Sequence, residues 1–286
     1  MTGLERLTVP IEQGTLSVVT AGAPTDQPIM LLHGIPSNAY LFRDVLPRLA
    51  QAGYYALAPD MPGYGETRLG DDADYSLSAV ADTYAAWLER DAYAPVWLVG
   101  HDLGGAVAQL IAVRYPHLLS RLTLGNCPLG DSFPVPAVNM AVAMARAGLF
   151  LPFASLGLFP NFYMTGEVRR GFGDSARLTS DMLDTVFWAG KTKSEAGRRE
   201  FAKHLRHLRN DESVEIVPQL KSLPMPVQVL WSSLDRHQSA ETSGRQLLLA
   251  LPEGTPFEVV EGAGHFMPLE TPADYATRLL AWPTNQ

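Results

Sequence analysis

The chain has 286 residues, of which 47% are hydrophobic and 18% are charged, with 24 Gly and 22 Pro. These proportions are typical of a globular enzyme and exclude a disordered, collagenous or coiled-coil protein. The 30 acidic residues outnumber the 22 basic ones and give a formal net charge of −8, which disfavours binding to nucleic acid or to an anionic membrane. The single cysteine, Cys127, excludes an intramolecular disulfide framework.

Two features bear on targeting. The N-terminal sequence MTGLERLTVP lacks the basic segment followed by an apolar one that a secretory signal has. The most apolar segment, 147–159, is interrupted by Pro152 and is shorter than the roughly 20 residues needed to cross a bilayer. We therefore expect a cytoplasmic protein that does not bind membranes.

Short apolar runs rich in Val, Leu and Ile alternate with longer amphipathic segments. In chain order, the runs predict strands over 29–32, 54–58, 96–99, 121–124, 227–231 and 257–260. The intervening segments predict helices over 37–51 with Ser37 as N-cap, and over 76–91, 103–115, 239–251 and 271–280. This alternation predicts an α/β fold with a mostly parallel, doubly wound sheet.

The alternation stops after residue 124 and resumes at residue 227. The segment between these strands has helical patterning and begins and ends with clustered prolines. Because the flanking runs pair naturally as neighbouring strands of one sheet, the sequence predicts a main domain over 1–129 and 223–286. Residues 130–222 are predicted to form an inserted helical cap.

Candidate reacting residues follow three of the predicted strands, where the site of an open α/β sheet lies. The run 96–99 leads into the sequence GHDLGG, a G-x-nucleophile-x-G turn between strand and helix in which Asp102 takes the place of the usual serine. Asp235 follows the run 227–231, and His265 follows the run 257–260. The order nucleophile, acid and base is the order used by α/β-hydrolases.

The sequence resembles the α/β-hydrolase superfamily, and within it the branch with an aspartate nucleophile, which contains epoxide hydrolases and haloalkane dehalogenases. Five segments carry the resemblance: HGIPSNAYLFRDVLPRLA from His33, APDMPGYGET from Ala58, GHDLGG from Gly100, LWSSLD from Leu230 and GAGHFMPLE from Gly262. The resemblance implies an α/β-hydrolase fold. It also implies an oxyanion hole formed by the backbone N–H groups of Ile35 and Leu103.

An aspartate nucleophile favours an electrophilic sp³ carbon. Its carboxylate is ionised at neutral pH and needs no base for the first attack. Attack on an epoxide or a carbon–halogen bond gives a stable alkyl ester on Asp102, whereas attack on an acyl group would give a mixed anhydride. His265, held by Asp235, would then activate the water that hydrolyses the ester.

The leaving group separates the two activities. By the resemblance, a halide needs N–H donors on the side chains at positions 35 and 103, where this chain has Ile and Leu, so Asn38 or Trp188 would have to supply them. An epoxide needs two cap tyrosines, of which only Tyr163 is present. We expect Tyr163, Trp188 and Asn38 to contact a small hydrophobic substrate, and epoxide hydrolysis as the activity.

Other functions on the same fold stay open: haloalkane dehalogenation, a cofactor-free lyase or esterase, and a binding protein that keeps a hydrolase shell. No His, Asp, Glu or Cys spacing outside the three candidate residues is typical of a metal site, so we expect no metal and no organic cofactor. The sequence does not indicate an oligomeric state.

Overall fold

The computed structural model describes residues 3–156, 161–189 and 194–282; at residue 137 and residues 161–164 it describes the backbone alone. Within these ranges the strands are β1 (Glu5–Ile11), β2 (Gly14–Ala21), β3 (Gln27–Leu32), β4 (Tyr54–Pro59), β5 (Arg68–Leu69), β6 (Val96–His101), β7 (Leu119–Gly125), β8 (Val227–Ser232) and β9 (Phe257–Val260). They form one sheet in the order β1-β2-β4-β3-β6-β7-β8-β9, with β5 paired to β2.

The sheet is parallel from β4 to β9 and antiparallel at its N-terminal edge. β2 pairs antiparallel with β1, β4 and β5, and the other neighbouring pairs are parallel. The predicted mostly parallel α/β fold is confirmed, and all six predicted strands are present. β1, β2 and β5 were not predicted. Exposed residues interrupt the apolar pattern of β1, polar residues such as Thr15, Ser17 and Thr20 interrupt that of β2, and β5 has two residues.

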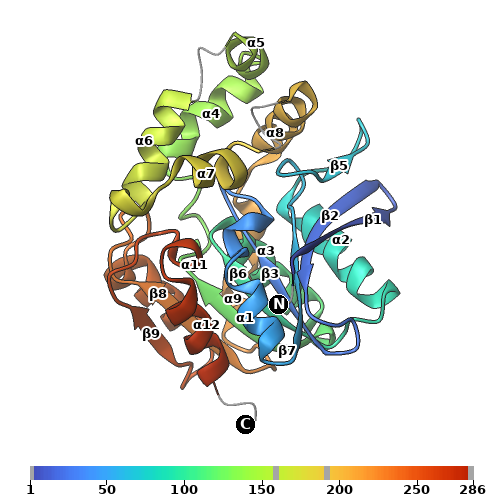
Figure 1. Cartoon of the computed structure of the whole chain (residues 1–286), viewed down its shortest axis with the longest axis vertical. Coiled ribbons are helices and arrows are strands. Elements are labelled where there is room, and N and C mark those ends of the chain that lie inside the picture. The colour runs from blue at the N-terminus through green and yellow to red at the C-terminus, as the bar shows by residue number, and fades with distance from the viewer. Residues whose placement is uncertain (1–2, 157–160, 190–193, 283–286) are drawn as a thin grey trace.

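The α-helices are α1 (Leu46–Gln51), α2 (Leu77–Arg90), α3 (Leu103–Arg114), α4 (Pro136–Arg146), α5 (Phe150–Ser155), α6 (Asn161–Gly171), α7 (Ser180–Met182), α8 (Glu195–His207), α9 (Asp211–Leu220), α10 (Arg245–Ala250), α11 (Met267–Glu270) and α12 (Pro272–Ala281). α2, α3, α9 and α10 contribute to the apolar cluster on one face of the sheet, and α1 and α12 to the cluster on the other. Figure 1 shows the sheet between these helices.

β3 illustrates how one strand serves both faces. Ile29 and Leu31 belong to the cluster that includes α1 and α12, whereas Met30 and Leu32 belong to the cluster that includes α2 and α3. Successive side chains of a strand point to opposite faces, so a strand buried on both faces must be apolar throughout. This burial explains why the central strands were recognisable as short continuous apolar runs.

One predicted helix, 37–51, is broken in the structure. A short 3₁₀ turn covers Ala39–Phe42, and α1 begins only at Leu46. Asn38, rather than the predicted Ser37, caps the 3₁₀ turn by accepting a hydrogen bond from the backbone N–H of Tyr40. Pro47 lies in the first turn of α1, the position in a helix that tolerates the missing N–H of proline.

The helices α4, α5, α6, α7 and α8 lie beyond the end of the sheet, at the top of Figure 1. α4, α5 and α8 pack on one another, whereas α9 packs on α3 within the helical layer of the main domain. Residues 130–222 therefore include one helix that belongs with the sheet. We propose that the helical cap ends before α9.

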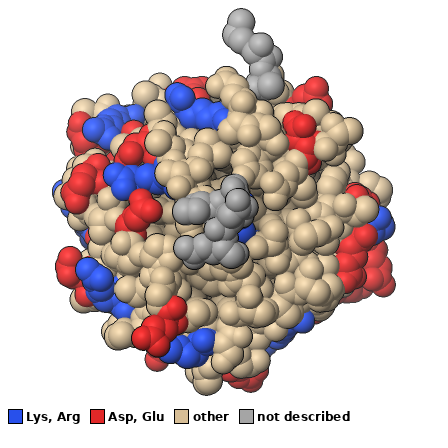
Figure 2. All heavy atoms as spheres, turned by 90° about the horizontal axis from the view of Figure 1, so that it is seen from below, with Lys and Arg blue, Asp and Glu red and all other residues tan. Residues whose placement is uncertain are grey.

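The surface carries both signs of charge. Figure 2 shows one face of the molecule, on which acidic and basic side chains alternate near the rim and uncharged residues form most of the centre. Across the described ranges, no helix combines the length and the apolar character needed to cross a lipid bilayer.

Candidate active site

Asp102 lies in a sharp turn between β6 and α3. Its backbone has φ 51° and ψ −129°, a conformation that residues with a Cβ rarely adopt. A Cβ on Gly104 would lie 2.3 Å from the carbonyl oxygen of His33, and one on Gly100 would lie 2.6 Å from the Cα of Gly105. Glycine at these positions lets strand and helix pack tightly, and the Asp102 side chain projects beyond the carboxyl end of β6.

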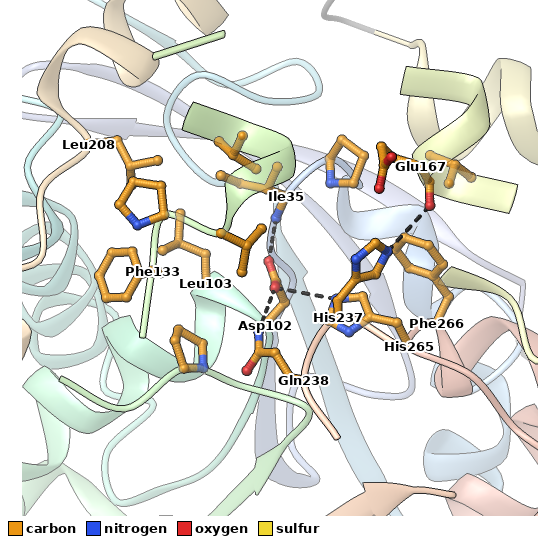
Figure 3. A pocket seen from close by; sticks show the side chains of 16 residues that line it. Ile35, Asp102, Leu103, Phe133, Glu167, Leu208, His237, Gln238, His265 and Phe266 are labelled. Carbon is orange, nitrogen blue, oxygen red and sulfur yellow. Dashed lines mark hydrogen bonds and ion pairs between the residues drawn. The ribbon is translucent and has the colours of Figure 1, made fainter. Parts of the chain in front are cut away.

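The two oxygens of Asp102 have different partners. The backbone N–H of Ile35 donates to Oδ1 at 2.7 Å, and the backbone N–H of Leu103 also bonds to the carboxylate. Oδ2 faces Nε2 of His265 at 3.3 Å and accepts a hydrogen bond from the Nε2 amide of Gln238 at 3.4 Å (Figure 3). Oδ1 is thus held by a backbone donor, while Oδ2 faces an imidazole and an amide.

His265 follows β9, and its ring bridges two carboxylates. Nδ1 lies 2.8 Å from Oδ2 of Asp235, and Nε2 on the opposite edge lies 3.3 Å from Oδ2 of Asp102. Because Nδ1 faces a carboxylate, which can only accept, this nitrogen carries a proton. The backbone N–H of His265 donates to the carbonyl of Gly171, the last residue of α6, at 2.6 Å.

Asp235 is fully buried and held from several directions. Its Oδ1 accepts the backbone N–H groups of His237 at 2.8 Å and Gln238 at 2.9 Å. Its Oδ2 accepts the Nδ2 amide of Asn126 at 2.6 Å, and Oδ1 of that amide accepts the backbone N–H of Ser232 at 3.1 Å. These donors fix the carboxylate that in turn orients His265.

The charges of these groups are coupled. Burial alone would lower the pKa of His265, but the charges of Asp235 and Asp102 and their hydrogen bonds raise it to about 10. Burial alone would raise the pKa of Asp102 and of Asp235, but their interactions with His265 hold both below the usual value. Burial lowers the pKa of His101 to about 3, so this neighbour adds no positive charge. At neutral pH the group holds two carboxylates and one imidazolium.

Asp102 and His265 form part of the wall of a cavity of about 690 Å³ of empty space, counted to its opening. The lining is mostly apolar and comprises Ile35, Pro36, Asp102, Leu103, Pro128, Phe133, Pro134, Val135, Val138, Glu167, Val168, Leu208, His237, Gln238, His265 and Phe266. Figure 3 shows these side chains around the Asp102 carboxylate.

The structure brings the predicted reacting residues together, but it does not place all of the predicted substrate contacts at the cavity. Asp102, Asp235, His265, Ile35 and Leu103 lie together as described above. Asn38 and Trp188, two of the three predicted substrate contacts, do not line the cavity.

Asn38 is buried, and its Nδ2 amide donates to the carbonyl of Thr185 at 2.8 Å, so this amide is already engaged. Trp188 packs in the apolar cluster that also contains Val168 and Phe266, and neither Asn38 nor Trp188 is part of the lining. The prediction that they contact the substrate is corrected accordingly. Tyr163 falls within α6, but its side chain lies outside the described residues.

Four residues of this region were not predicted from the sequence: Asn126, Glu167, His237 and Gln238. Asn126 directly follows β7, and His237 and Gln238 lie in the loop after β8, five and six residues beyond Ser232. The ends of strands were the signal that identified the reacting residues. Glu167 lies on α6, and no motif in the sequence indicated which face of that helix meets the cavity.

In the described ranges, no three His, Cys, Asp or Glu side chains are arranged as the ligands of a metal ion. Asp102, Asp235 and His265 are satisfied by one another and by their hydrogen-bond donors.

Comparison with known proteins identifies relatives over nearly the whole chain. A family model described as the alpha/beta hydrolase family matches residues 29–278. An uncharacterized protein of Mycobacterium bovis is 27% identical over 264 residues, which cover 86% of this chain and 72% of that protein. A haloalkane dehalogenase of Mycobacterium marinum is 31% identical over 144 residues, which cover 48% of each chain.

Among solved structures, the ligand-free epoxide hydrolase CorEH superposes with a TM-score of 0.77 at 22% sequence identity, covering 97% of both chains. At this identity the likeness establishes the shared fold. The family model, by contrast, is matched by amino-acid sequence, and the match covers residues 29–278, which is most of the chain.

Proposed function

The chain belongs to the alpha/beta hydrolase family, and we propose that it hydrolyses epoxides through a covalent ester on Asp102. One observation carries the proposal: the carboxylate of Asp102, in the turn between β6 and α3, lines a mostly apolar cavity. Its Oδ1 accepts the backbone N–H of Ile35, and its Oδ2 faces His265. A carboxylate nucleophile suits an sp³ carbon better than an acyl carbon, because its alkyl ester is a stable intermediate that water can hydrolyse.

In the first step Oδ2 of Asp102 attacks one epoxide carbon. The new bond joins Oδ2 to carbon, the ring C–O bond breaks, and the ring oxygen leaves as an alkoxide on the neighbouring carbon. Oδ1 becomes the carbonyl oxygen of the ester and stays on the N–H of Ile35. The alkoxide then needs one proton.

The proton balance favours an epoxide over a halide. While Asp102 and Asp235 are both anionic, the pKa of His265 is about 10 and the ring is protonated. Alkylation removes the charge of Asp102, so the pKa of His265 falls. His265 thus gives up one proton to solvent as the alkoxide takes up one from solvent, and the ring is left as the neutral base required for the second step.

In the second step the Nε2 atom of His265 takes a proton from water, and the oxygen of that water bonds to Cγ of Asp102. Negative charge then develops on Oδ1, where the backbone N–H groups of Ile35 and Leu103 stabilise it. The ester C–O bond breaks, and the leaving diol oxygen takes the proton from His265. The carboxylic acid left at Asp102 then gives its proton to Nε2 of His265, which restores both the carboxylate and the imidazolium of the resting state.

Gln238 is suited to hold the reacting groups of the second step. Its Nε2 amide bonds to Oδ2 of Asp102, on the side from which Asp102 attacks, whereas a leaving group departs on the far side of the carbon. Its Oε1 atom is buried and has no hydrogen-bond partner among the described residues. We propose that this oxygen accepts a hydrogen bond from the hydrolytic water.

Haloalkane dehalogenation is the second candidate, supported by the relative from Mycobacterium marinum. The cavity favours it less, because no Trp or Asn is found among the described lining residues and the side chains of Ile35 and Leu103 cannot donate to a halide. An esterase or lyase on this fold would have no use for an alkyl ester on Asp102.

The proposal is tested by trapping the ester. The variant His265→Gln is incubated with 1,2-epoxyhexane and its intact mass is measured. We expect the mass to rise by one substrate molecule, with the adduct mapped by proteolysis to the peptide that contains Asp102. The matched variant Asp102→Asn in the same assay should show no adduct.

The activity is then assigned by product. Wild-type protein is assayed with terminal epoxides for diol and with 1-bromoalkanes for bromide. Diol formation without bromide release supports the epoxide assignment, and the reverse result supports the dehalogenase. An unmodified His265→Gln protein with undiminished turnover would exclude the covalent mechanism for both substrates.

A further inference from the structure

The cavity contains a carboxylate that the proposed reaction does not use. Glu167 lies on α6, lines the cavity, and has a side chain that is 20% exposed. Its ion pair with Arg170 is 3.7 Å long, and Arg170 is 63% exposed, so water screens this pair and it contributes little. In Figure 3, Glu167 and Gln238 lie on opposite sides of Asp102.

Positive charge in the cavity is scarce. Among the described lining residues there is no Lys or Arg. Besides Glu167, Asp102 and His265, the described lining holds one more titratable side chain, that of His237, whose pKa is lowered by burial and, to a smaller extent, by the charge of His265. Its Nε2 faces the backbone carbonyl of Glu167 at 3.3 Å; because a carbonyl only accepts, this nitrogen carries the proton of a neutral ring.

The charge balance shifts further during the reaction. In the resting state the imidazolium of His265 bridges the carboxylates of Asp102 and Asp235, and Glu167 has no such partner within the lining. Once Asp102 is esterified, Glu167 is the one carboxylate left among the described lining residues. A carboxylate in a mostly apolar cavity is costly unless a cation or hydrogen-bond donor accompanies it.

The rest of the lining suits an alkylated ammonium group. Phe133 and Phe266 supply aromatic rings, and aliphatic side chains and prolines supply most of the remaining surface. Quaternary ammonium ions bind where aromatic faces and a carboxylate meet, because the ring faces carry partial negative charge and the methyl groups prefer an apolar surface. A carboxylate substrate would instead meet the charge of Glu167.

We infer that the cavity accepts substrates whose reactive carbon is joined by a short apolar linker to an ammonium group, with Glu167 as the counter-ion. This inference rests on the proposed function for the identity of the reactive carbon. The ammonium site itself can be tested without turnover.

The first experiment measures binding by isothermal titration calorimetry. The probes are choline and its uncharged carbon isostere 3,3-dimethylbutan-1-ol, which have nearly the same shape. We expect wild type to bind choline about tenfold more tightly, which corresponds to about 1.4 kcal/mol, and Glu167→Gln to lose this preference. The control Glu195→Gln removes an exposed charge that pairs with Arg199 on α8, and should keep the preference.

The second experiment measures kcat/KM for glycidyltrimethylammonium and for its carbon isostere 4,4-dimethyl-1,2-epoxypentane. We expect wild type to prefer the cation by about tenfold and Glu167→Gln to reduce that ratio toward one. Equal binding of the two probes by wild type, or a choline preference that survives in Glu167→Gln, would overturn the inference. If the choline preference is present but neither epoxide reacts, the ammonium site stands and the proposed function fails.

Discussion

Replacing Asp102 by Asn tests the charge coupling on which the proposed mechanism depends. The substitution removes one carboxylate from the edge of His265 while leaving Asp235 on the other edge, and so reproduces the charge change that esterification would cause. Nε2 of His265 lies 3.3 Å from Oδ2 of Asp102. At that separation and an effective dielectric constant of about 20, the two charges attract by about 5 kcal/mol.

One pKa unit corresponds to about 1.4 kcal/mol, so losing this attraction should lower the pKa of His265 by about three to four units. The pKa should therefore fall from about 10 in wild type to between about 6 and 7 in Asp102→Asn. His265 would then be largely neutral at pH 7.5, as a general base must be. The shift should leave in place the proton on Nδ1 of His265, which faces Oδ2 of Asp235.

The assay is a pH titration of the imidazole ¹⁵N chemical shifts in protein labelled at histidine. Seven histidines contribute signals, and those of His265 are assigned by their absence in His265→Gln. Near-ultraviolet circular dichroism checks that each variant is folded. A wild-type His265 that titrates near pH 6.5, or a pKa left unchanged by Asp102→Asn, would refute the reasoning.

Four further outcomes are expected. Gly34→Ala should abolish adduct formation while the circular dichroism spectrum persists, because the added Cβ would lie 2.1 Å from Oδ1 of the nucleophile. Gln238→Leu should slow ester hydrolysis more than ester formation in single-turnover kinetics, so that the alkyl-enzyme accumulates; parallel slowing would argue against its contact with water. Tyr163→Phe should slow epoxide opening far more than it weakens binding if this tyrosine donates to the alkoxide, and unchanged kinetics would remove it from that role. Between pH 6.5 and 10, the melting temperature of wild type should fall further than that of His265→Gln. The pKa of His265 is about 10 in the folded state and 6.5 in the free residue, so protonation of His265 stabilises the fold fully below pH 6.5, and this stability is lost as the pH rises to 10.

The central strands and the elbow could be predicted from sequence because backbone geometry dictates their residues. Asp102 adopts a positive φ in the sharp turn after β6, and the strand and the helix nearly touch there. Positions such as Gly104 therefore have no room for a side chain larger than that of glycine. Burial on both faces likewise requires an apolar strand at β3 and β6. Local constraints of this kind produce a pattern that can be recognised in the amino-acid sequence.

The partners of the reacting residues left no comparable pattern. Asn126 and Gln238 act through hydrogen bonds made by side chains that are brought together only by the folded sheet. Asn38 was predicted to face the substrate as an alternative N–H donor to a leaving halide, but its amide is turned to the carbonyl of Thr185. Residues of this kind are placed by tertiary contacts between segments far apart in the chain.

The residues of the reaction and the residue proposed to select the substrate differ in the same way: local geometry fixes the first, and tertiary contacts place the second. The strand ends supply Asp102 and His265, whose positions are set by the sheet. α6 supplies Glu167 to the cavity, and its end also contacts the base directly, since the carbonyl of Gly171 accepts the backbone N–H of His265. A substrate that binds Glu167 therefore contacts the same helix, α6, whose last residue is hydrogen-bonded to His265. Changes in α6 should alter both substrate preference and the rate of ester hydrolysis, whereas changes at the elbow should alter the reaction alone.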